Sequence, residues 1–339
     1  MKKAFFSMFL ITVVCGLSFA QARQIYIAGR DGNDAVYWLN GSRTVLPKSS
    51  SNVNAYAVAI TVSGSNVYIA GVDGNDAVYW LNGSRTVLPK SSDRAATNDI
   101  AVSGSNVYIA GIDGGEAVYW LNGRRTVLPK SSNNVSAYAI AIAVSGSDVY
   151  IAGRDGNDAV YWLNGRRTVL SRGSYMAAYA SAITISGSDV YITGRNGNYD
   201  AVYWLNGQQT ILPQPDWDDL SWARGWGSAN AIVVSGSNIH IAGQDSLSGE
   251  FRTDKPMYWL NGNGVALPKS SGDVIGNASV NAIAVSGSDV FIAGFIFDVT
   301  GREGSILNGQ YNAVYWLNGR RNDLPSSSDA NANGIAIIE

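Results

Sequence analysis

The stretch AIAVSGSDVYIAGRDGNDAVYWLNGRRTVL, residues 141–170, decides the fold because its pattern recurs along the whole chain. Each copy combines a segment like Tyr-Ile-Ala-Gly, a short loop rich in Asp, Gly and Asn, and the string Tyr-Trp-Leu-Asn-Gly. Repeats of this length with strand-like content are typical of propellers and solenoids, because one unit cannot bury its apolar faces alone. The repeats carry tryptophans 40 to 57 residues apart, at Trp38, Trp80, Trp120, Trp162, Trp204, Trp259 and Trp316.

Each copy is expected to form four antiparallel strands. The two-residue turn signal Asn164-Gly165 favours a tight hairpin, and the other turns of this copy are also rich in Gly, Ser, Asn and Asp. The inner strands are rich in Ala and Ile, which fits crowding at a narrow axis. Four strands in meander order form the blade of a β-propeller, so we predict an all-β, seven-bladed propeller. The strands of the quoted copy are expected at 139–144, 149–153, 159–163 and 167–170.

The two ends of the chain predict how the ring closes. The first copy begins directly at Gln24 and lacks an inner strand, whereas residues 334–338 form an inner strand with nothing after it. We therefore predict that residues 334–338 complete the first blade, so that no sheet edge is left free. Residues 23–339 are then a single propeller domain.

Residues 1–22 have the pattern of a secretory signal peptide, with Lys2 and Lys3, an apolar run to about Leu17, and small residues near Ala20. We expect export, to the periplasm or to the outside of a bacterium. The apolar run is too short for a permanent span and no later stretch reaches its length, so no integral membrane segment is expected.

Cys15 is the only cysteine, and it lies in the signal segment. Lipid anchoring through Cys15 is an alternative to simple cleavage. Without that anchor the mature chain carries no thiol, which suits an oxidising compartment.

Charge and motifs argue against several functional classes. The net charge of -2 becomes -2 - 2 = -4 without Lys2 and Lys3, which gives no attraction to nucleic acid. We expect no cofactor, no metal and a monomer. The sequence shows no Cys/His cluster, and its Asp-Gly-Asn-Asp loops lack the alternating ligands of an EF-hand, which favours turn chemistry. These loops carry Asp31, Asp34, Asp73, Asp76, Asp155 and Asp158.

The string AIAVSGSDVYIAG at 141–153 resembles the inner hairpin of the NHL and YVTN classes of β-propeller. The whole unit, ending in Val-Tyr-Trp-Leu-Asn-Gly, is similar to repeats of exported bacterial propellers without assigned activity. The resemblance covers residues 23–339 and implies the fold but no particular function, because propellers host enzymes, lectins and scaffolds alike. The chain departs from NHL repeats after the second strand, so no NHL partner is implied.

Loop lengths predict where a site lies. First and third turns keep their length and emerge on one face, whereas second turns and inter-blade connections emerge on the other, which we call the long-loop face. Three long loops are expected there in blades five to seven, and loops on a rigid scaffold commonly carry function. They span residues 214–230, 244–256 and 295–312. Their candidate binding residues are Asp216, Trp217, Asp218, Asp219, Trp222, Trp226, Phe251, Arg252, Asp298 and Tyr311.

Three functional hypotheses follow. The first is an exported, non-enzymatic protein that binds a glycan or a protein through these aromatic and acidic residues; packing of the loops against one another is the alternative interpretation of the tryptophans. The second is a propeller glycosidase or lyase with a carboxylate pair near the axial mouth. The third is a structural or surface-display repeat protein. The pair would come from Asp216, Asp218, Asp219, Glu250, Asp254, Asp298 and Glu303.

Two further features are expected to serve structure. His240, the only histidine, replaces a Tyr of the second strand, so a packing role is favoured over catalysis. The recurring arginines after the Asn-Gly turn are expected to be solvated or paired with a neighbouring Asp, although a multivalent lectin would also repeat a ligand residue. They are Arg43, Arg85, Arg125 and Arg167.

Overall fold

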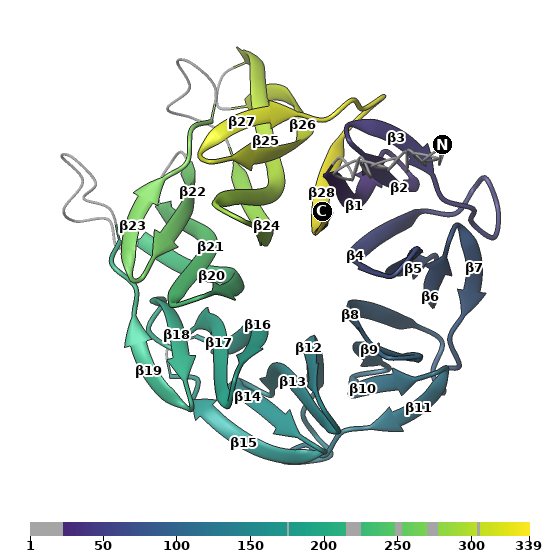
Figure 1. Cartoon of the computed structure of the whole chain (residues 1–339), viewed down its shortest axis with the longest axis vertical. Helices are drawn as coiled ribbons and strands as arrows, with labels where there is room; N and C mark the ends of the chain where they lie inside the picture. The colour runs from purple at the N-terminus through teal and green to yellow at the C-terminus, as the bar shows by residue number, and fades with distance from the viewer. Residues whose placement is uncertain (1–22, 175, 215–224, 248–252, 270–276, 304–305) are drawn as a thin grey trace, which may run out of the picture.

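The computed structural model describes residues 23–174, 176–214, 225–247, 253–269, 277–303 and 306–339. Within these ranges the strands form seven four-stranded antiparallel sheets, arranged as blades around a central axis (Figure 1). The predicted seven-bladed propeller is therefore confirmed.

The blades follow one another around the ring in chain order. Blade 1 comprises β28 (Ala330–Ile338), β1 (Gln24–Asp31), β2 (Asp34–Leu39) and β3 (Ser42–Val45). Blade 2 comprises β4 (Ala55–Ser63), β5 (Asn66–Asp73), β6 (Asp76–Leu81) and β7 (Ser84–Val87). Blade 3 comprises β8 (Ala95–Ser103), β9 (Asn106–Asp113), β10 (Glu116–Leu121) and β11 (Arg124–Val127). Blade 4 comprises β12 (Ala137–Ser145), β13 (Asp148–Asp155), β14 (Asp158–Leu163) and β15 (Arg166–Ser171).

The last three blades repeat this order with longer strands in places. Blade 5 comprises β16 (Tyr179–Ser186), β17 (Asp189–Arg195), β18 (Ala201–Leu205) and β19 (Gln208–Ile211). Blade 6 comprises β20 (Gly225–Ser235), β21 (Asn238–Leu247), β22 (Thr253–Leu260) and β23 (Asn263–Ala266). Blade 7 comprises β24 (Ala278–Ser286), β25 (Asp289–Glu303), β26 (Ile306–Leu317) and β27 (Arg320–Asp323).

The ring closes as predicted, through the C-terminal strand. β28 pairs antiparallel with β1, from Gln24 opposite Ile338 to Asp31 opposite Ala330, so the strand is longer than the expected 334–338. Its side chains Ala332 and Ile335 are buried among residues of blades 7 and 1. Closure therefore joins the two ends of the chain in one sheet.

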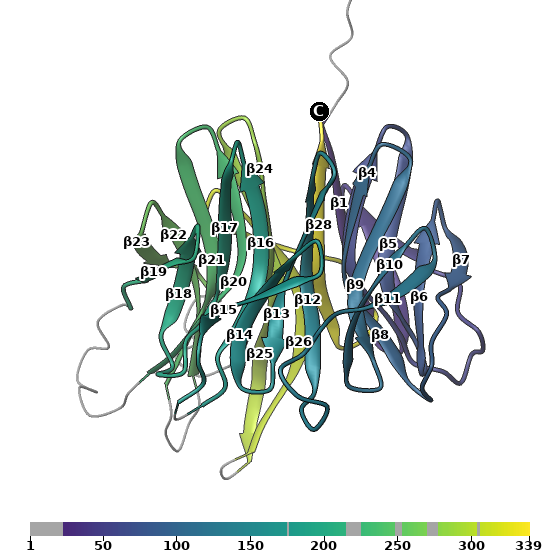
Figure 2. The same cartoon turned by 90° about the horizontal axis from the view of Figure 1, so that it is seen from below.

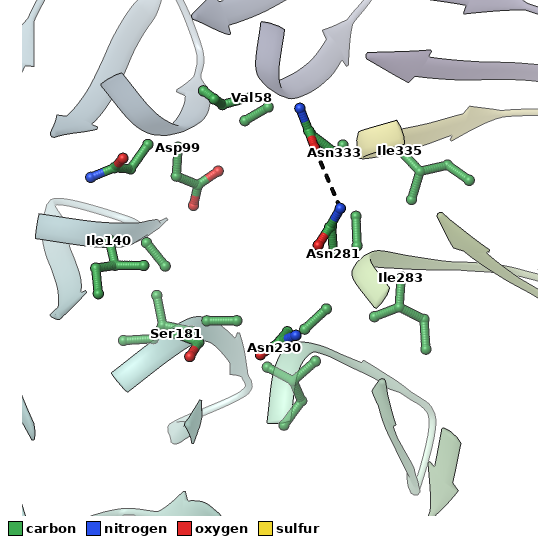
Figure 3. A pocket seen from close by; sticks show the side chains of 18 of the residues that line it. Val58, Asp99, Ile140, Ser181, Asn230, Asn281, Ile283, Asn333 and Ile335 are labelled. Carbon is green, nitrogen blue, oxygen red and sulfur yellow. Dashed lines mark hydrogen bonds between the residues drawn. The ribbon is translucent and has the colours of Figure 1, made fainter. Parts of the chain in front are cut away.

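Every inner strand contains a β-bulge. The bulge is the fourth residue of the nine-residue strands and the aligned residue of β16 and β20. In β12 the register shifts between Ala139 and Ala141, so Ile140 is the extra residue and points toward the axis (Figure 3). A Cβ on the facing Gly153 would lie 1.9 Å from the carbonyl oxygen of Tyr138. Only glycine fits this close approach, which explains why the second strand of each repeat reads Tyr-Ile-Ala-Gly or a close variant.

A buried indole links neighbouring blades. The Nε1 of Trp80 donates a hydrogen bond of 2.8 Å to the carbonyl oxygen of Pro47, in the connection that precedes blade 2. Trp204 differs, because Ser171 stands where the other repeats have Pro, and the buried Nε1 of Trp204 has no hydrogen-bond partner. The same Trp–Pro bond is formed by Trp38, Trp120, Trp162, Trp259 and Trp316.

A second inter-blade link is an Asp–Ser–Arg cluster. Asp113 accepts hydrogen bonds from the backbone N and Oγ atoms of Ser91 and Ser92, and its Oδ2 lies 2.6 Å from the Nε of Arg125. The expected pairing of the recurring arginines is thus confirmed. Equivalent ion pairs are Arg43–Asp31, Arg85–Asp73 and Arg167–Asp155. Blade 5 instead has Asn196 and Gln209 at the two positions.

These tryptophans provide a matched comparison of stability. Trp80→Phe removes a satisfied buried donor and leaves the Pro47 carbonyl unpaired, whereas Trp204→Phe removes a donor that already lacks a partner. We expect Trp80→Phe to cost about 1–3 kcal/mol more free energy of unfolding than Trp204→Phe. Urea unfolding of both variants measures the difference. An equal loss would contradict a stabilising role for the Trp–Pro bond.

The three expected long loops are shorter than predicted. Residues 295–312 form an extended hairpin of β25 and β26, which projects from the long-loop face away from the C-terminus (Figure 2). Likewise, β20 starts at Gly225, and β21 and β22 extend into the expected loop at 244–256. The loop interpretation was wrong for these parts, because cross-strand pairing continues past the usual blade length: Phe297 faces Tyr311, with ring centroids 4.9 Å apart.

Candidate functional site on the long-loop face

A cavity of about 590 Å³ lies on the axis, and inner strands from all seven blades line it (Figure 3). The bulge residues of the inner strands line this cavity. In the nine-residue inner strands the bulge is the fourth residue, so it lies nearer the strand end at the long-loop face. The Ala and Ile residues expected at the axis are present, but polar side chains share the wall. The polar set consists of Asn98, Asp99, Ser181, Asn230, Asn281 and Asn333.

Four of these residues form an amide belt around the axis. Each Asn uses its Nδ2 to donate a hydrogen bond to a carbonyl oxygen of the next blade. The bonds are Asn98 to Ala139, Asn230 to Val280, Asn281 to Ala332 and Asn333 to Ala57, with lengths of 2.8 to 2.9 Å. The belt is interrupted at Val58, Ile140 and Ser181, which occupy the same position in blades 2, 4 and 5.

Asp99 adds a carboxylate to this wall. It stands where the other inner strands have Ala or Gly, and its Oδ2 accepts a bond of 2.8 Å from the backbone N of Ile142. Burial raises the pKa of Asp99 to about 6, even though this bond and one from the N of Ile100 favour the charged form. Among the described residues that line the cavity, Asp99 is the one acidic group.

An aromatic cluster lies beside the cavity on blades 5 and 6. Tyr199 stacks on Trp226, with ring centroids 5.5 Å apart and an interplanar angle of 23°. The guanidinium of Arg195 lies over the rings of Tyr179 and Tyr199, at 4.8 and 5.8 Å from their centroids. These distances are typical of cation–π contacts. We refer to Tyr179, Arg195, Tyr199 and Trp226 as the aromatic cluster.

Hydrogen bonds connect this cluster to the cavity wall. The hydroxyl of Tyr179 lies 3.0 Å from the Oγ of Ser228, and that Oγ donates to the Oδ1 of Asn230 at 2.5 Å. Asn230 in turn belongs to the amide belt. The cluster is therefore joined to the polar wall through the buried hydroxyl of Ser228.

Tyr199 adopts an unusual backbone conformation, with φ of +71°. Bulky residues rarely occupy this left-handed region, and such strain is often found at functional positions. Tyr199 is also an insertion: the second turn of blade 5 runs from Asn196 to Asp200, one residue longer than the turn from Asp155 to Asp158 in blade 4. Its ring remains half-buried, as do those of Tyr179 and Trp226.

The structure places three of the predicted binding residues, in two groups. Trp226 lies in β20 and stacks on blade 5, whereas Asp298 and Tyr311 lie in the blade 7 hairpin. The other predicted binding residues lie outside the described residues: Asp216, Trp217, Asp218, Asp219, Trp222, Phe251 and Arg252.

The blade 7 residues are engaged in structural contacts. Asp298 accepts hydrogen bonds from Arg321 at 2.7 and 3.2 Å and from the Nδ2 of Asn312 at 2.8 Å. Burial acts to raise the pKa of Asp298, but these bonds and the charge of Arg321 outweigh it and hold the pKa below its ordinary value. Tyr311 packs on Phe295 and Phe297. Asp298 is thus a permanent partner of Arg321 rather than a free acid or base.

His240 has the packing role expected from the sequence. Its side chain is buried in β21, and its Nδ1 lies 2.8 Å from the hydroxyl of Tyr258. Burial lowers the pKa of His240, so the imidazole is neutral at pH 7.

Neither a metal cluster nor a spanning helix appears in the described ranges. No group of three or more His, Cys, Asp or Glu side chains there could hold a metal ion. No helix in the same ranges has the length and apolar character needed to cross a membrane.

Comparisons with known proteins add little to this site. No family model matches the chain, and no curated protein matches it. The chain is similar to a structure described as a nidogen/laminin complex, with 10% sequence identity and a TM-score of 0.42, over 66% of this chain and 88% of that one. It is also similar to the computationally designed Ika8 protein, with 13% identity and a TM-score of 0.38, over 79% and 95% of the two chains. Both scores are too low to support any statement about the site.

Proposed function

We propose that this protein is an exported, non-enzymatic glycan-binding protein whose ligand lies on the long-loop face, against the aromatic cluster. The observation that carries the proposal is the stacked pair of Tyr199 and Trp226, partly exposed and built around a strained, inserted residue. Rigid aromatic rings offer a flat apolar surface with little loss of side-chain entropy on binding. Sugar rings present a matching apolar face.

The neighbouring cavity supports a glycan rather than a protein as the ligand. Its volume of about 590 Å³ falls within the range of small-molecule sites, whereas a protein partner needs a broad surface of roughly 800 Å² on each side. Amide and hydroxyl groups both donate and accept hydrogen bonds, as sugar hydroxyls do. The end of a glycan chain can therefore enter the axial mouth while a neighbouring ring packs on the cluster.

The enzyme hypothesis requires a pair of carboxylates. Asp298 is held by Arg321, Asp254 is buried, and Asp99 is the one carboxylate among the described residues that line the cavity. The side chains of the other candidates lie outside the described part of the chain: Asp216, Asp218, Asp219, Glu250 and Glu303. We therefore assign no catalytic residue.

Tyr199→Gly separates a binding role of the aromatic cluster from a packing role. Glycine adopts φ of +71° without strain, so the change removes the ring and relieves the backbone together. We expect glycan affinity to fall by about tenfold or more, with a melting temperature that stays the same or rises. A glycan array, followed by calorimetry with the strongest hit, measures the first effect, and thermal unfolding measures the second.

Trp226→Phe is the matched control for this experiment. It keeps an aromatic ring opposite Tyr199, so most of the affinity should remain. Unchanged affinity in Tyr199→Gly together with a lower melting temperature would show that the cluster serves packing. An array without any binder would contradict the proposed function itself.

A further inference from the structure

Two groups of arginines in this fold differ in their partners. Arg43, Arg85, Arg125, Arg167 and Arg321 each lie within 2.5 to 2.7 Å of a carboxylate oxygen of an Asp. Arg30, Arg154 and Arg195 form a second group and share one position in the second strands of blades 1, 4 and 5. None of these three forms an ion pair with a described residue.

Two of these arginines, on adjacent blades, lie over aromatic rings. Arg195 belongs to the cluster itself, and Arg154 occupies the equivalent position of blade 4, with its guanidinium 4.6 Å from the ring centroid of Tyr138. Tyr138 lines the axial cavity. Aromatic rings thus hold both guanidinium groups in place without neutralising their charge.

We propose that the glycan recognised at this site is anionic, and that Arg195 binds its charged group. This inference rests on the proposed function and specifies its ligand class: a sugar ring bearing a carboxylate or a sulfate. A planar guanidinium matches the paired oxygens of either group, and the neighbouring tyrosines reduce the entropy lost when it is bound. The sugar ring itself is expected to pack on Tyr199 and Trp226.

Several features of the site suit an acidic sugar better than a neutral one. A neutral ligand would leave the Arg195 guanidinium desolvated and unpaired, which is unfavourable. The nearby acidic side chains are already engaged: Asp155 pairs with Arg167, and Asp200 accepts a hydrogen bond from Asn196. The amide belt and Ser181 are uncharged. Asp99 is the one acidic group among the described residues that line the cavity, and its carboxylate already accepts hydrogen bonds from the backbone N atoms of Ile100 and Ile142.

The test compares matched glycans with the full protein. One probe is an oligogalacturonate, the second is its carboxyl-reduced neutral counterpart, and the third is a sulfated oligosaccharide from heparin. We expect one or both acidic probes to bind at least about tenfold more tightly than the neutral probe, with affinity that weakens as salt is raised. The two acidic probes distinguish a carboxylate ligand from a sulfate ligand.

Arginine variants connect this preference to the site. Arg195→Gln should weaken binding of the acidic probe by about tenfold or more and bring its affinity close to that of the neutral probe. Arg30→Gln is the matched control, because Arg30 has the same place in blade 1, far around the ring from blades 4 and 5, and should not change affinity. Melting temperatures of both variants show whether the fold is retained.

The possible outcomes distinguish a failure of the anionic-ligand proposal from a failure of glycan binding itself. Equal binding of acidic and neutral probes, or an Arg195→Gln variant that keeps full affinity for the acidic probe, overturns the anionic ligand but leaves glycan binding intact. Binding of no glycan, acidic or neutral, overturns both. A preference for acidic probes that Arg30→Gln and Arg195→Gln weaken equally shows general attraction by the whole face and overturns the assigned site.

Discussion

Deleting residues 330–339 is expected to prevent stable folding. The deletion removes β28, which pairs with eight residues of β1 and buries Ala332 and Ile335 between the blades. It also removes two bonds of the amide belt, from Asn281 to Ala332 and from Asn333 to Ala57. The expected loss exceeds about 5 kcal/mol, which is comparable to the whole stability of many domains. Far-UV circular dichroism and urea unfolding followed by tryptophan fluorescence measure it.

A circular permutant provides the control for this deletion. Residues 330–338 placed before Gln24 through a Gly-Ser linker recreate the inner hairpin of the other blades, where two residues separate Ser63 from Asn66. Because every native contact of β28 is kept, the permutant should fold with near-native stability. A deletion variant that is as stable as the full chain would contradict the closure of the ring by β28.

The sequence predicts the fold well because the fold depends on local, repeated signals. The Asn-Gly turns adopt the expected positive φ angles, with Asn164 at +49° and Gly165 at +81°. The C-terminal strand could be recognised because it has the sequence of an inner strand but no second strand after it. Ring closure supplies β1 as its partner. Boundaries were less predictable: the blade 7 hairpin extends to Glu303 and Ile306 because aromatic pairs continue the sheet beyond the repeat.

The site was harder to predict because its residues differ from the repeat rather than define it. The residues of the amide belt lie at the β-bulges of their inner strands. A bulge interrupts the regular alternation of side chains between the two faces of a strand, so this alternation does not reveal which residue faces the axis. A comparison of the seven inner strands shows the signal, since Asn98, Asn230, Asn281 and Asn333 stand among Ala and Ile residues. The insertion of Tyr199 is visible only against the turn length of the other blades.

The contacts between blades 4 and 5 depart from the repeat at several positions. The amide belt stops at Ile140, Trp204 has no Trp–Pro bond, and Asn196 and Gln209 replace the charged pair of the Asp–Ser–Arg cluster. The aromatic cluster lies where blade 5 meets blade 6, with Trp226 stacked on Tyr199. Blade 5 therefore combines lost inter-blade bonds with the proposed binding residues, as expected where function modifies a repeated scaffold.

Asp113→Ala is expected to cost about 3 kcal/mol or more of the free energy of unfolding, because it leaves a partly buried Arg125 and two backbone N–H groups without their acceptor. Burial acts to raise the pKa of Asp113, but hydrogen bonds from Ser92 and Ser91 and the charge of Arg125 outweigh it and lower the pKa below 3.8. The stability that Asp113 contributes is therefore fully present well above the ordinary pKa of an Asp and is lost as the pH falls through the lowered pKa.

The surface pair of Lys90 and Asp76 provides the control for Asp113→Ala. This pair has a similar distance of 2.7 Å, but the Asp76 side chain is 34% exposed whereas that of Asp113 is 0% exposed. Because solvent screens an exposed pair, Asp76→Ala should cost less than about 1 kcal/mol. Urea unfolding at pH 7 and at pH 3 should show a large loss for Asp113→Ala that shrinks in acid. Equal losses in the two variants would mean that the Asp–Ser–Arg cluster does not join the blades energetically, and that the hydrophobic contacts between sheets alone stabilise the ring.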